Sequence, residues 1–136
     1  MPYSFEFDAV NGILLCRLQG KVTSQLFRDF FKVGAEYAVR TQPSAGVVDF
    51  SGITVFGVST ETIHELAKWP PVLRSPDLRR IVIAPSPEIY GLMRMFEIEG
   101  EGRRPDIHVV RTEQEAWAIL AVTNLQFKPL DEQDRS

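Results

Sequence analysis

The sequence has little cysteine, no long apolar run and no excess of basic charge. Cys16 is the one cysteine in 136 residues, which excludes an internal disulfide and suits a reducing compartment. No apolar run approaches the ~18 residues of a membrane-spanning helix, and residues 1–10 lack the basic and apolar regions of a signal peptide. The net charge of −3 argues against a nucleic-acid-binding surface. We therefore expect a cytoplasmic protein with no membrane span and no nucleic-acid partner.

The sequence also lacks the common motifs of catalysis and metal binding. It contains neither the glycine-rich and lysine-containing phosphate loops nor the G-x-S-x-G motif of hydrolases. Its two histidines, His64 and His108, have no cysteine, histidine or carboxylate one helical turn further along the chain. We predict that the protein is not an enzyme and that it has no catalytic residue, metal or cofactor.

The composition that remains is typical of one globular domain. The hydrophobic fraction of 44% and the charged fraction of 24% are near the averages for soluble proteins, and the length is enough to bury one core. We expect a domain over residues 1–121 and a C-terminal tail over 122–136. The last six residues, 131–136, are expected to be disordered.

A β-hairpin is predicted for the first twenty residues. Asn11-Gly12 is typical of a two-residue type I′ turn, and that turn places Glu6 directly opposite Arg17. With this register one face of the hairpin is apolar. That face consists of Phe5, Phe7, Ala9, Leu14, Cys16 and Leu18.

The other face of the hairpin carries an apolar group that needs a cover. The group consists of Val10, Ile13 and Leu15, near the turn. Two covers are open: the tail residues Leu125, Phe127 and Leu130, or a second copy of the chain. We favour a homodimer through this face, since an isologous dimer is the commonest soluble assembly.

Beyond the hairpin, helical and strand patterns alternate along the chain. Helices are predicted over residues 23–42, 59–69, 86–99 and 112–121, and strands over 45–50, 78–84 and 106–110. Thr23 or Ser24, Ser59 and Ser86 are expected to cap the first three helices, and Thr112 opens a capping box for the last. This order predicts a single α/β domain with a mixed sheet, in which the hairpin supplies the antiparallel part.

The junction between the strand at 45–50 and the next helix carries a recognisable motif. Residues 47–63 read VVDFSGITVFGVSTETI, and in this stretch Asp49, Ser51 and Gly52 match the pattern of the STAS (SpoIIAA-like) domain, which the chain resembles. That is the fold of the anti-sigma-factor antagonists and of the cytoplasmic tails of sulfate transporters. The resemblance covers roughly residues 3–121 and implies a regulatory, protein-binding domain.

The chain departs from the antagonist pattern within this motif. Gly57, Val58 and Thr60 stand where the antagonists have Asp, the phosphorylated Ser and Gly. The resemblance therefore implies the fold without that phosphorylation chemistry.

A second motif points to one branch of the family. Residues 84–96 read APSPEIYGLMRMF and are similar to a segment of the small stand-alone bacterial proteins called STAS/Sec14-like. The Sec14 comparison implies a hydrophobic pocket between the helices and the sheet. In this segment Gly91 is expected to let the helix approach the sheet closely, and Arg94 is the candidate for meeting an anion or a partner on the surface.

Two hypotheses for function follow. The first is a non-enzymatic regulatory or protein-interaction domain that acts through the connector at 52–60, with its candidate site at Phe56, Gly57, Val58, Ser59 and Thr60. A phosphate on Ser59 or Thr60 would be stabilised at the start of the following helix, whereas the simpler interpretation makes Ser59 only its N-cap.

The second hypothesis is a carrier or sensor of a small apolar ligand or lipid. Its candidate pocket consists of Phe30, Phe31, Trp69, Met93, Met95 and Phe96. Aromatic residues and methionines at helical spacing also serve as ordinary core, so this hypothesis ranks below the first.

Overall fold

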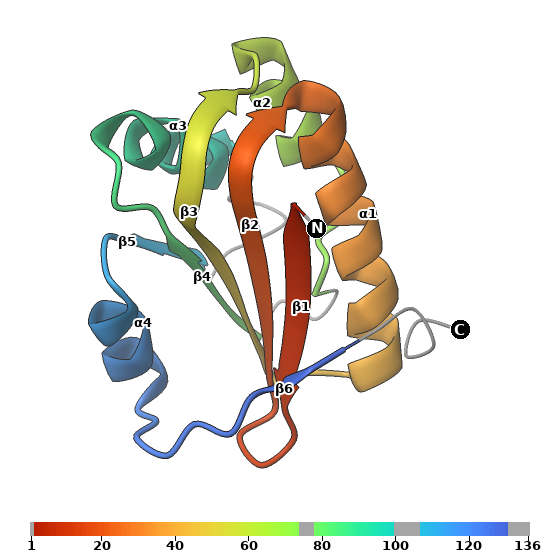
Figure 1. Cartoon of the computed structure of the whole chain (residues 1–136), viewed down its shortest axis with the longest axis vertical. Coiled ribbons are helices and arrows are strands. Elements are labelled where there is room, and N and C mark those ends of the chain that lie inside the picture. The colour runs from red at the N-terminus through yellow and green to blue at the C-terminus, as the bar shows by residue number, and fades with distance from the viewer. Residues whose placement is uncertain (1, 74–77, 100–106, 131–136) are drawn as a thin grey trace.

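The computed structural model describes residues 2–73, 78–99 and 107–130 of the chain. Its strands are β1 (Tyr3–Asp8), β2 (Ile13–Thr23), β3 (Ala45–Gly57), β4 (Arg79–Ile83), β5 (Ile107–Val110) and β6 (Lys128–Pro129). Its helices are α1 (Ser24–Thr41), α2 (Thr60–Ala67), α3 (Pro87–Glu99) and α4 (Glu113–Leu120). The strands form one sheet in the order β5-β4-β3-β2-β1-β6 (Figure 1).

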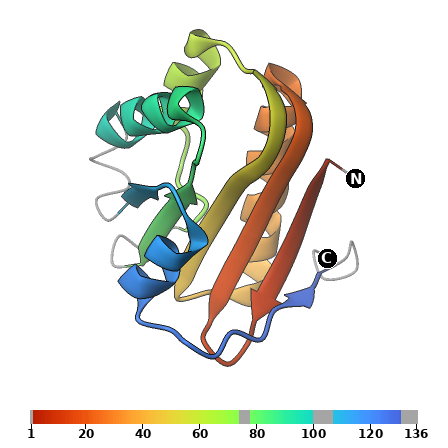
Figure 2. The ribbon, with the colours of Figure 1, turned by 60° about the vertical axis from the view of Figure 1, so that its left-hand side comes forward.

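The sheet is mixed, which confirms the predicted fold class. Strands β2, β3, β4 and β5 are parallel neighbours, whereas β1 is antiparallel to both β2 and β6. From β2 to β5 each new strand is added on the same side of the previous one. Because the connections between parallel strands are right-handed, the helices in these connections lie on one face of the sheet. Helices α1, α2 and α3 accordingly share one face, and α4 lies on the other with the C-terminal segment (Figure 2).

The two faces of the sheet bury different cores. The α1 face holds an aromatic cluster around the buried residues Phe27, Phe30 and Phe50. The Phe50 ring lies near the rings of both Phe27 and Phe30. The α4 face is aliphatic, and its buried members are Ile13, Leu15, Ala45, Val47, Ile81, Ile83, Val110 and Ala116. Cys16 is buried on the α1 face, as predicted, and burial raises the pKa of its thiol.

The predicted hairpin forms, but its predicted register is wrong by two residues. Asp8 pairs with Ile13, so the loop spans four residues rather than two. The Asp8 carboxylate causes this, because it accepts hydrogen bonds from the backbone N–H groups of Val10 and Asn11, each at 3.0 Å. A two-residue shift keeps the paired side chains on their predicted faces, whereas Ala9 and Val10 now lie in the loop. Glu6 now lies opposite Leu15 and still reaches Arg17 diagonally, with 3.1 Å between Oε2 and Nε.

Strand β3 is longer than predicted, and the predicted connector at 52–60 is mostly strand. Ser51-Gly52 does not end β3, because the Asp49 carboxylate accepts the backbone N–H of Ser51 at 2.9 Å. The extra residue is absorbed as a bulge: β2 advances from Arg17 to Gln19 while β3 advances from Asp49 to Gly52. The strand then continues beside β2 to Gly57.

The predicted helix caps are largely confirmed. The side chains of Thr23, Ser59 and Thr112 each accept the backbone N–H three residues further on, at the starts of α1, α2 and α4. The expectation for Gly91 is wrong: the residue is exposed, and a Cβ there would meet nothing within 4 Å. Helix α3 instead approaches the core through Ile89, Met93 and Phe96. None of the described helices is long and apolar enough to cross a membrane.

The segment after α4 packs onto the domain. Leu125 and Phe127 lie against the aliphatic core, and β6 adds an antiparallel strand beside β1. Ile13 and Leu15 are therefore covered within one chain, which removes the reason for expecting a dimer through this face. Val10 in the loop stays 74% exposed. The expectation of disorder at 131–136 lies outside the described residues.

Candidate protein-interaction site

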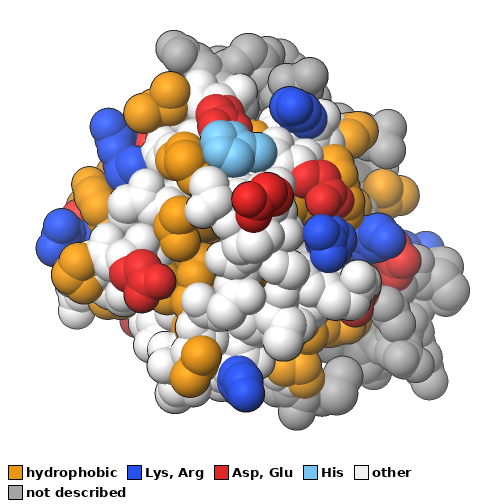
Figure 3. Space-filling view, turned by 90° about the horizontal axis from the view of Figure 1, so that it is seen from above, with side chains coloured by type: hydrophobic (Ala, Val, Ile, Leu, Met, Phe, Trp, Pro, Cys, Tyr) orange, Lys and Arg blue, Asp and Glu red, His pale blue; other side chains and the backbone are white. Residues whose placement is uncertain are grey.

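The junction between β3 and α2 presents an exposed surface at the end of the sheet. Gly57, Ser59 and Thr60 are exposed, whereas Phe56 is half-buried and Val58 is buried. Figure 3 looks onto this end of the molecule, where apolar, acidic and basic side chains are interspersed and neither sign of charge prevails. Of the five residues predicted as a site, Phe56 and Val58 anchor the junction, and Gly57, Ser59 and Thr60 face solvent.

Phe56 and Val58 anchor the junction from inside. The Phe56 ring meets Phe27 edge-on, with 5.5 Å between centroids, and lies 6.5 Å from Phe50. Gly57, between the two anchors, passes close to β2: a Cβ there would lie 3.2 Å from the carbonyl oxygen of Val22. A larger residue at this position would have to push the two strands apart.

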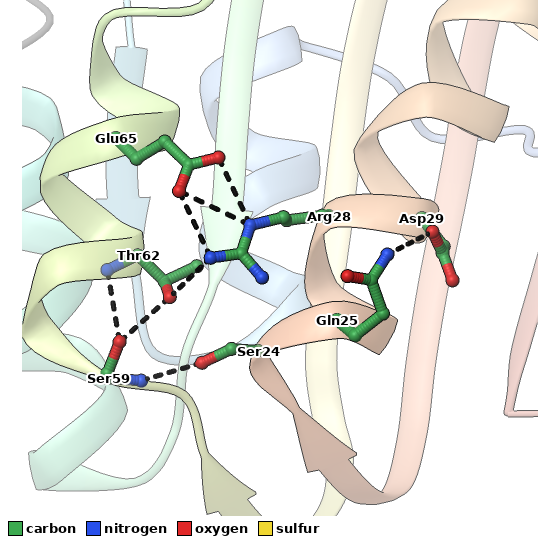
Figure 4. Close-up of polar contacts among 7 residues, drawn as sticks. All are labelled: Ser24, Gln25, Arg28, Asp29, Ser59, Thr62 and Glu65. Carbon is green, nitrogen blue, oxygen red and sulfur yellow. Dashed lines mark hydrogen bonds and ion pairs between the residues drawn. The ribbon is translucent and has the colours of Figure 1, made fainter.

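Ser59 is the N-cap of α2, as the simpler interpretation predicted. Its Oγ accepts the backbone N–H of Thr62 at 3.1 Å, and a second hydrogen bond of 2.8 Å joins the two hydroxyls. The backbone N–H of Ser59 donates to Ser24 Oγ, at the start of α1, at 3.0 Å (Figure 4). The hydroxyl that a kinase would modify is therefore already engaged in holding α2.

An ion pair that the sequence analysis missed clamps α1 to α2. The Arg28 guanidinium donates to both carboxylate oxygens of Glu65, with Nε–Oε2 and Nη2–Oε1 distances of 3.1 Å, and reaches the Thr62 hydroxyl at 3.4 Å (Figure 4). The hydrogen bond to Arg28 lowers the pKa of Glu65 and that to Glu65 raises the pKa of Arg28. No sequence signal indicates this pair, because its partners are 37 residues apart on different helices.

A small apolar cavity lies between α1, α3 and the sheet. Its volume is about 70 Å³, and four of the predicted pocket residues line it: Phe30, Phe31, Met93 and Phe96. Trp69 and Met95 are not among the lining residues. Trp69 instead lies near Lys32, whose Nζ is 5.9 Å from the ring centroid. The cavity is less than half the ~150 Å³ of an engineered cavity that holds benzene.

Arg94, the predicted surface anion contact, is engaged by its own helix. It forms an ion pair of 2.8 Å with Glu97, while the Tyr90 ring one turn earlier lies 4.5 Å from the guanidinium carbon of Arg111. The structure does not bring Arg94 into the network around Ser59 shown in Figure 4.

A second charged group was missed in the sequence, although its aspartate belongs to the recognised motif. Asp49 is 2% exposed, and its Oδ2 accepts a hydrogen bond of 2.7 Å from Arg17. Arg17 also contacts Glu6 and, at 3.6 Å, Glu113, so one guanidinium links β1, β2, β3 and α4. A buried aspartate in an apolar strand was the available signal, since such a charge needs a partner.

Comparison with solved structures identifies the fold. The chain is similar to the anti-sigma factor antagonist SpoIIAA in its unphosphorylated form, with a TM-score of 0.54 and 12% sequence identity over 90% of this chain and 99% of that one. The protein therefore has the STAS-like, SpoIIAA-like fold that its strand-to-helix motif indicated. No family model matches the sequence, and no curated protein is similar to it.

Proposed function

We propose that the protein is a non-enzymatic regulatory domain that binds a protein partner through the β3–α2 junction, Phe56–Thr60, and the first turn of α2. The observation that carries this proposal is the exposure of Gly57, Ser59 and Thr60 on a rigidly held backbone. The likeness to an anti-sigma factor antagonist supports a regulatory role for the same fold.

The physical argument is preorganisation. Binding costs less when the contact surface is already ordered, because little conformational freedom is lost. The Ser59 cap, the Ser24 hydrogen bond and the Arg28–Glu65 clamp hold the start of α2 from two sides. The exposed residues of the junction are left to contact a partner.

The test uses two substitutions matched for their effect on helix stability. Thr60→Arg adds a large cation to the first turn of α2, and Gln114→Arg adds the same side chain to the first turn of α4, on the opposite face of the sheet. Each cation faces a helix N-terminus, so both cost a similar fraction of a kcal/mol, roughly 0.3–1. Proteins captured from a lysate of the native host are then compared between the immobilised variants.

We expect Thr60→Arg to lose a partner that both the unchanged chain and Gln114→Arg retain. Photo-crosslinking from a residue placed at position 60 should then join that same partner. The same captured proteins with and without Thr60→Arg would contradict the proposed site.

Phosphorylation of Ser59 or Thr60 is a further regulatory step at this site. A phosphate on Ser59 would replace the hydroxyl that caps α2, next to the Thr62 that Arg28 contacts. It would add about −1.5 to −2 charges beside a cation and a helix N-terminus. Intact-mass measurement of the protein isolated from its native host tests this step, and a sample without phosphate under all growth conditions excludes it.

The second candidate function is binding of a very small apolar ligand in the cavity of about 70 Å³. The observation in its favour is the lining, which is apolar around Phe30, Phe31, Met93 and Phe96. A cavity of this size has no room for a lipid chain without rearrangement, so the ligand would be a few atoms in size.

Xenon is a suitable probe, and the methionine methyl groups are the reporters. Met93 lines the cavity and Met95, two residues on, does not, so Met95 is an internal control. Binding should shift the Met93 methyl resonance selectively under xenon pressure. Equal shifts of both methyl groups would indicate non-specific contact and exclude the cavity as a site.

A further inference from the structure

The strand edges of the sheet differ in how they are protected. Natural sheets guard an unpaired edge with a short strand, a lysine, a proline or a covering element, because the free N–H and C=O groups otherwise pair with another chain. The outer strand β5 has four residues, and the outer strand β6 is Lys128-Pro129 alone. The end of β2 that extends past β1 carries Lys21.

Apart from its bulges, which also disturb pairing along an edge, the second half of β3 has no such protection among the described residues. Strand β4 ends opposite Asp49, so from Gly52 to Gly57 β3 pairs with β2 alone. Gly52, Thr54 and Val55 are exposed, and the Val55 side chain is an exposed large hydrophobic residue at 50%. No charged residue occurs between Asp49 and Glu61.

We propose that this edge of β3 pairs, antiparallel, with the same edge of a second copy of the chain, around Val55. In an antiparallel pair about a two-fold axis at Val55, residues before Val55 pair with residues after it, and only those close to the axis meet their own copies. A charge close to Val55 would therefore face a like charge. The segment from Phe50 to Thr60 has none, which makes it compatible with itself. Pairing satisfies the free backbone groups and covers Val55.

The bulges in β3 set the strength of this association. Besides the bulge after Asp49, β3 advances from Ile53 to Val55 while β2 advances by one residue, from Gly20 to Lys21. Each bulge bends the strand and interrupts even pairing, so the straight run available to a partner strand is short. The dimer is therefore weak and dissociates on dilution.

This self-association does not depend on the proposed function. The proposed partner contact uses the exposed start of α2, whereas the dimer uses the backbone edge of β3. The dimer is measured with the purified chain alone, so its failure leaves the result for the partner of Thr60 unchanged.

The experiment uses opposite charges at one position. Val55→Lys and Val55→Glu each place like charges together at the two-fold axis, and Val39→Lys on α1, where Val39 is 66% exposed, is the control for adding a charge. The dimer dissociation constant is measured by sedimentation of each full-length variant over a wide range of concentration. Each Val55 variant alone should weaken the dimer by roughly tenfold or more.

An equimolar mixture of Val55→Lys and Val55→Glu should restore association, because lysine then faces glutamate. Val39→Lys should associate like the unchanged chain. Restoration in the mixture also shows that both variants are folded. A chain that stays monomeric at every concentration, a dimer that survives Val55→Lys, or an edge that binds only extended peptides of other proteins would each overturn the proposal.

Discussion

The two ends of the sheet are built in opposite ways. At the hairpin end, the fully buried Asp8 carboxylate accepts backbone N–H groups from Val10, Asn11 and Gln126, and the Asn11 side chain donates to the carbonyl of Asn124. At the junction end, β3 runs past its neighbour β4 and its residues face solvent. There the contacts drawn in Figure 4 join α1 to α2.

The hairpin end contributes mainly to stability, whereas the junction end is available for binding. The hairpin end joins segments 118 residues apart through one carboxylate, so the Asp8 carboxylate and the Asn11 side chain are paired within the chain. The junction end keeps an exposed backbone edge and an exposed helix start, which another molecule can contact. Substitutions at the hairpin end should therefore reduce the free energy of unfolding, and those at the junction should mainly affect association.

The largest effect is expected for Asp8→Ala. It removes the buried charged acceptor of several part-buried hydrogen bonds from the loop and from Gln126, and we expect the free energy of unfolding to fall by about 3 kcal/mol. Urea unfolding followed by tryptophan fluorescence measures the change. Asp29→Ala on α1 is the control and should be nearly neutral, because among the described residues its carboxylate forms a hydrogen bond with Gln25 alone. Equal effects of the two would show that Asp8 does not lock this end.

Acid should weaken the same end with a smaller effect. Burial alone would raise the pKa of Asp8, but hydrogen bonds from the Asn11 side chain and from the backbone of Gln126, Asn11 and Val10 lower it below its usual 3.8. Its ionised form is therefore stabilised by folding, and this stability is present above 3.8 and lost as pH falls through the lowered pKa. The stability difference between the unchanged chain and Asp8→Asn should shrink on acidification below 3.8. A constant difference would contradict it.

Asp49 lies at the boundary between the two halves of β3, and Asp49→Ala should reduce the free energy of unfolding by an intermediate amount. The substitution removes the buried partner of Arg17, which keeps Glu6 and Glu113, and the acceptor for the N–H of Ser51, and we expect the free energy of unfolding to fall by about 2 kcal/mol. Because the carboxylate holds the bulge, amide hydrogen exchange in Gly52–Gly57 should also accelerate. Faster exchange in Ala45–Asp49 alone would show that the bulge does not depend on Asp49.

The smallest effect is expected for Glu65→Gln at the junction. The pair with Arg28 is partly exposed on both sides and is screened by solvent, so its loss should lower the free energy of unfolding only slightly. The amide of Thr62 should still exchange faster, since the clamp steadies the start of α2. A loss of stability as large as that of Asp8→Ala would place the clamp among the stabilising contacts of the fold and contradict the contrast between the two ends.

Local patterns in the sequence predicted most of the elements correctly. Hairpin faces follow from alternation, and caps such as Ser59 and Thr112 follow from side chains that reach three residues along the chain. Both patterns involve residues only a few positions apart, so they can be recognised in the sequence without knowledge of the tertiary structure. The hairpin register was wrong because the prediction took Asn11-Gly12 as the whole loop, whereas the Asp8 carboxylate accepts the backbone N–H groups of Val10 and Asn11 in a loop of four residues. The hydrogen bond from Gln126 to the same carboxylate joins a segment that no local pattern indicates.

Some residues of the candidate sites were predicted from local sequence patterns, and others were not. Ser59 and Thr60 at a helix start were found from the sequence, and four pocket residues came together because they share helix faces. The Arg28–Glu65 clamp, the position of Trp69 outside the cavity and the free edge of β3 were not found. Each of these three features depends on how two helices or strands are placed relative to one another. The sequence of one helix or strand alone does not contain that information.

The amino-acid sequence by itself determined the order of strands and helices, the faces they bury and the STAS-like architecture. Periodicity and capping act over one or two turns and so survive in any window of the chain. Only the tertiary structure decided that β3 continues beside β2 past Ser51-Gly52, that Leu125 and Phe127 pack on the core around Ile13 and Leu15, and that one strand edge stays open. Those outcomes depend on hydrogen bonds and burial between segments far apart, and such contacts exist only once the whole chain is folded.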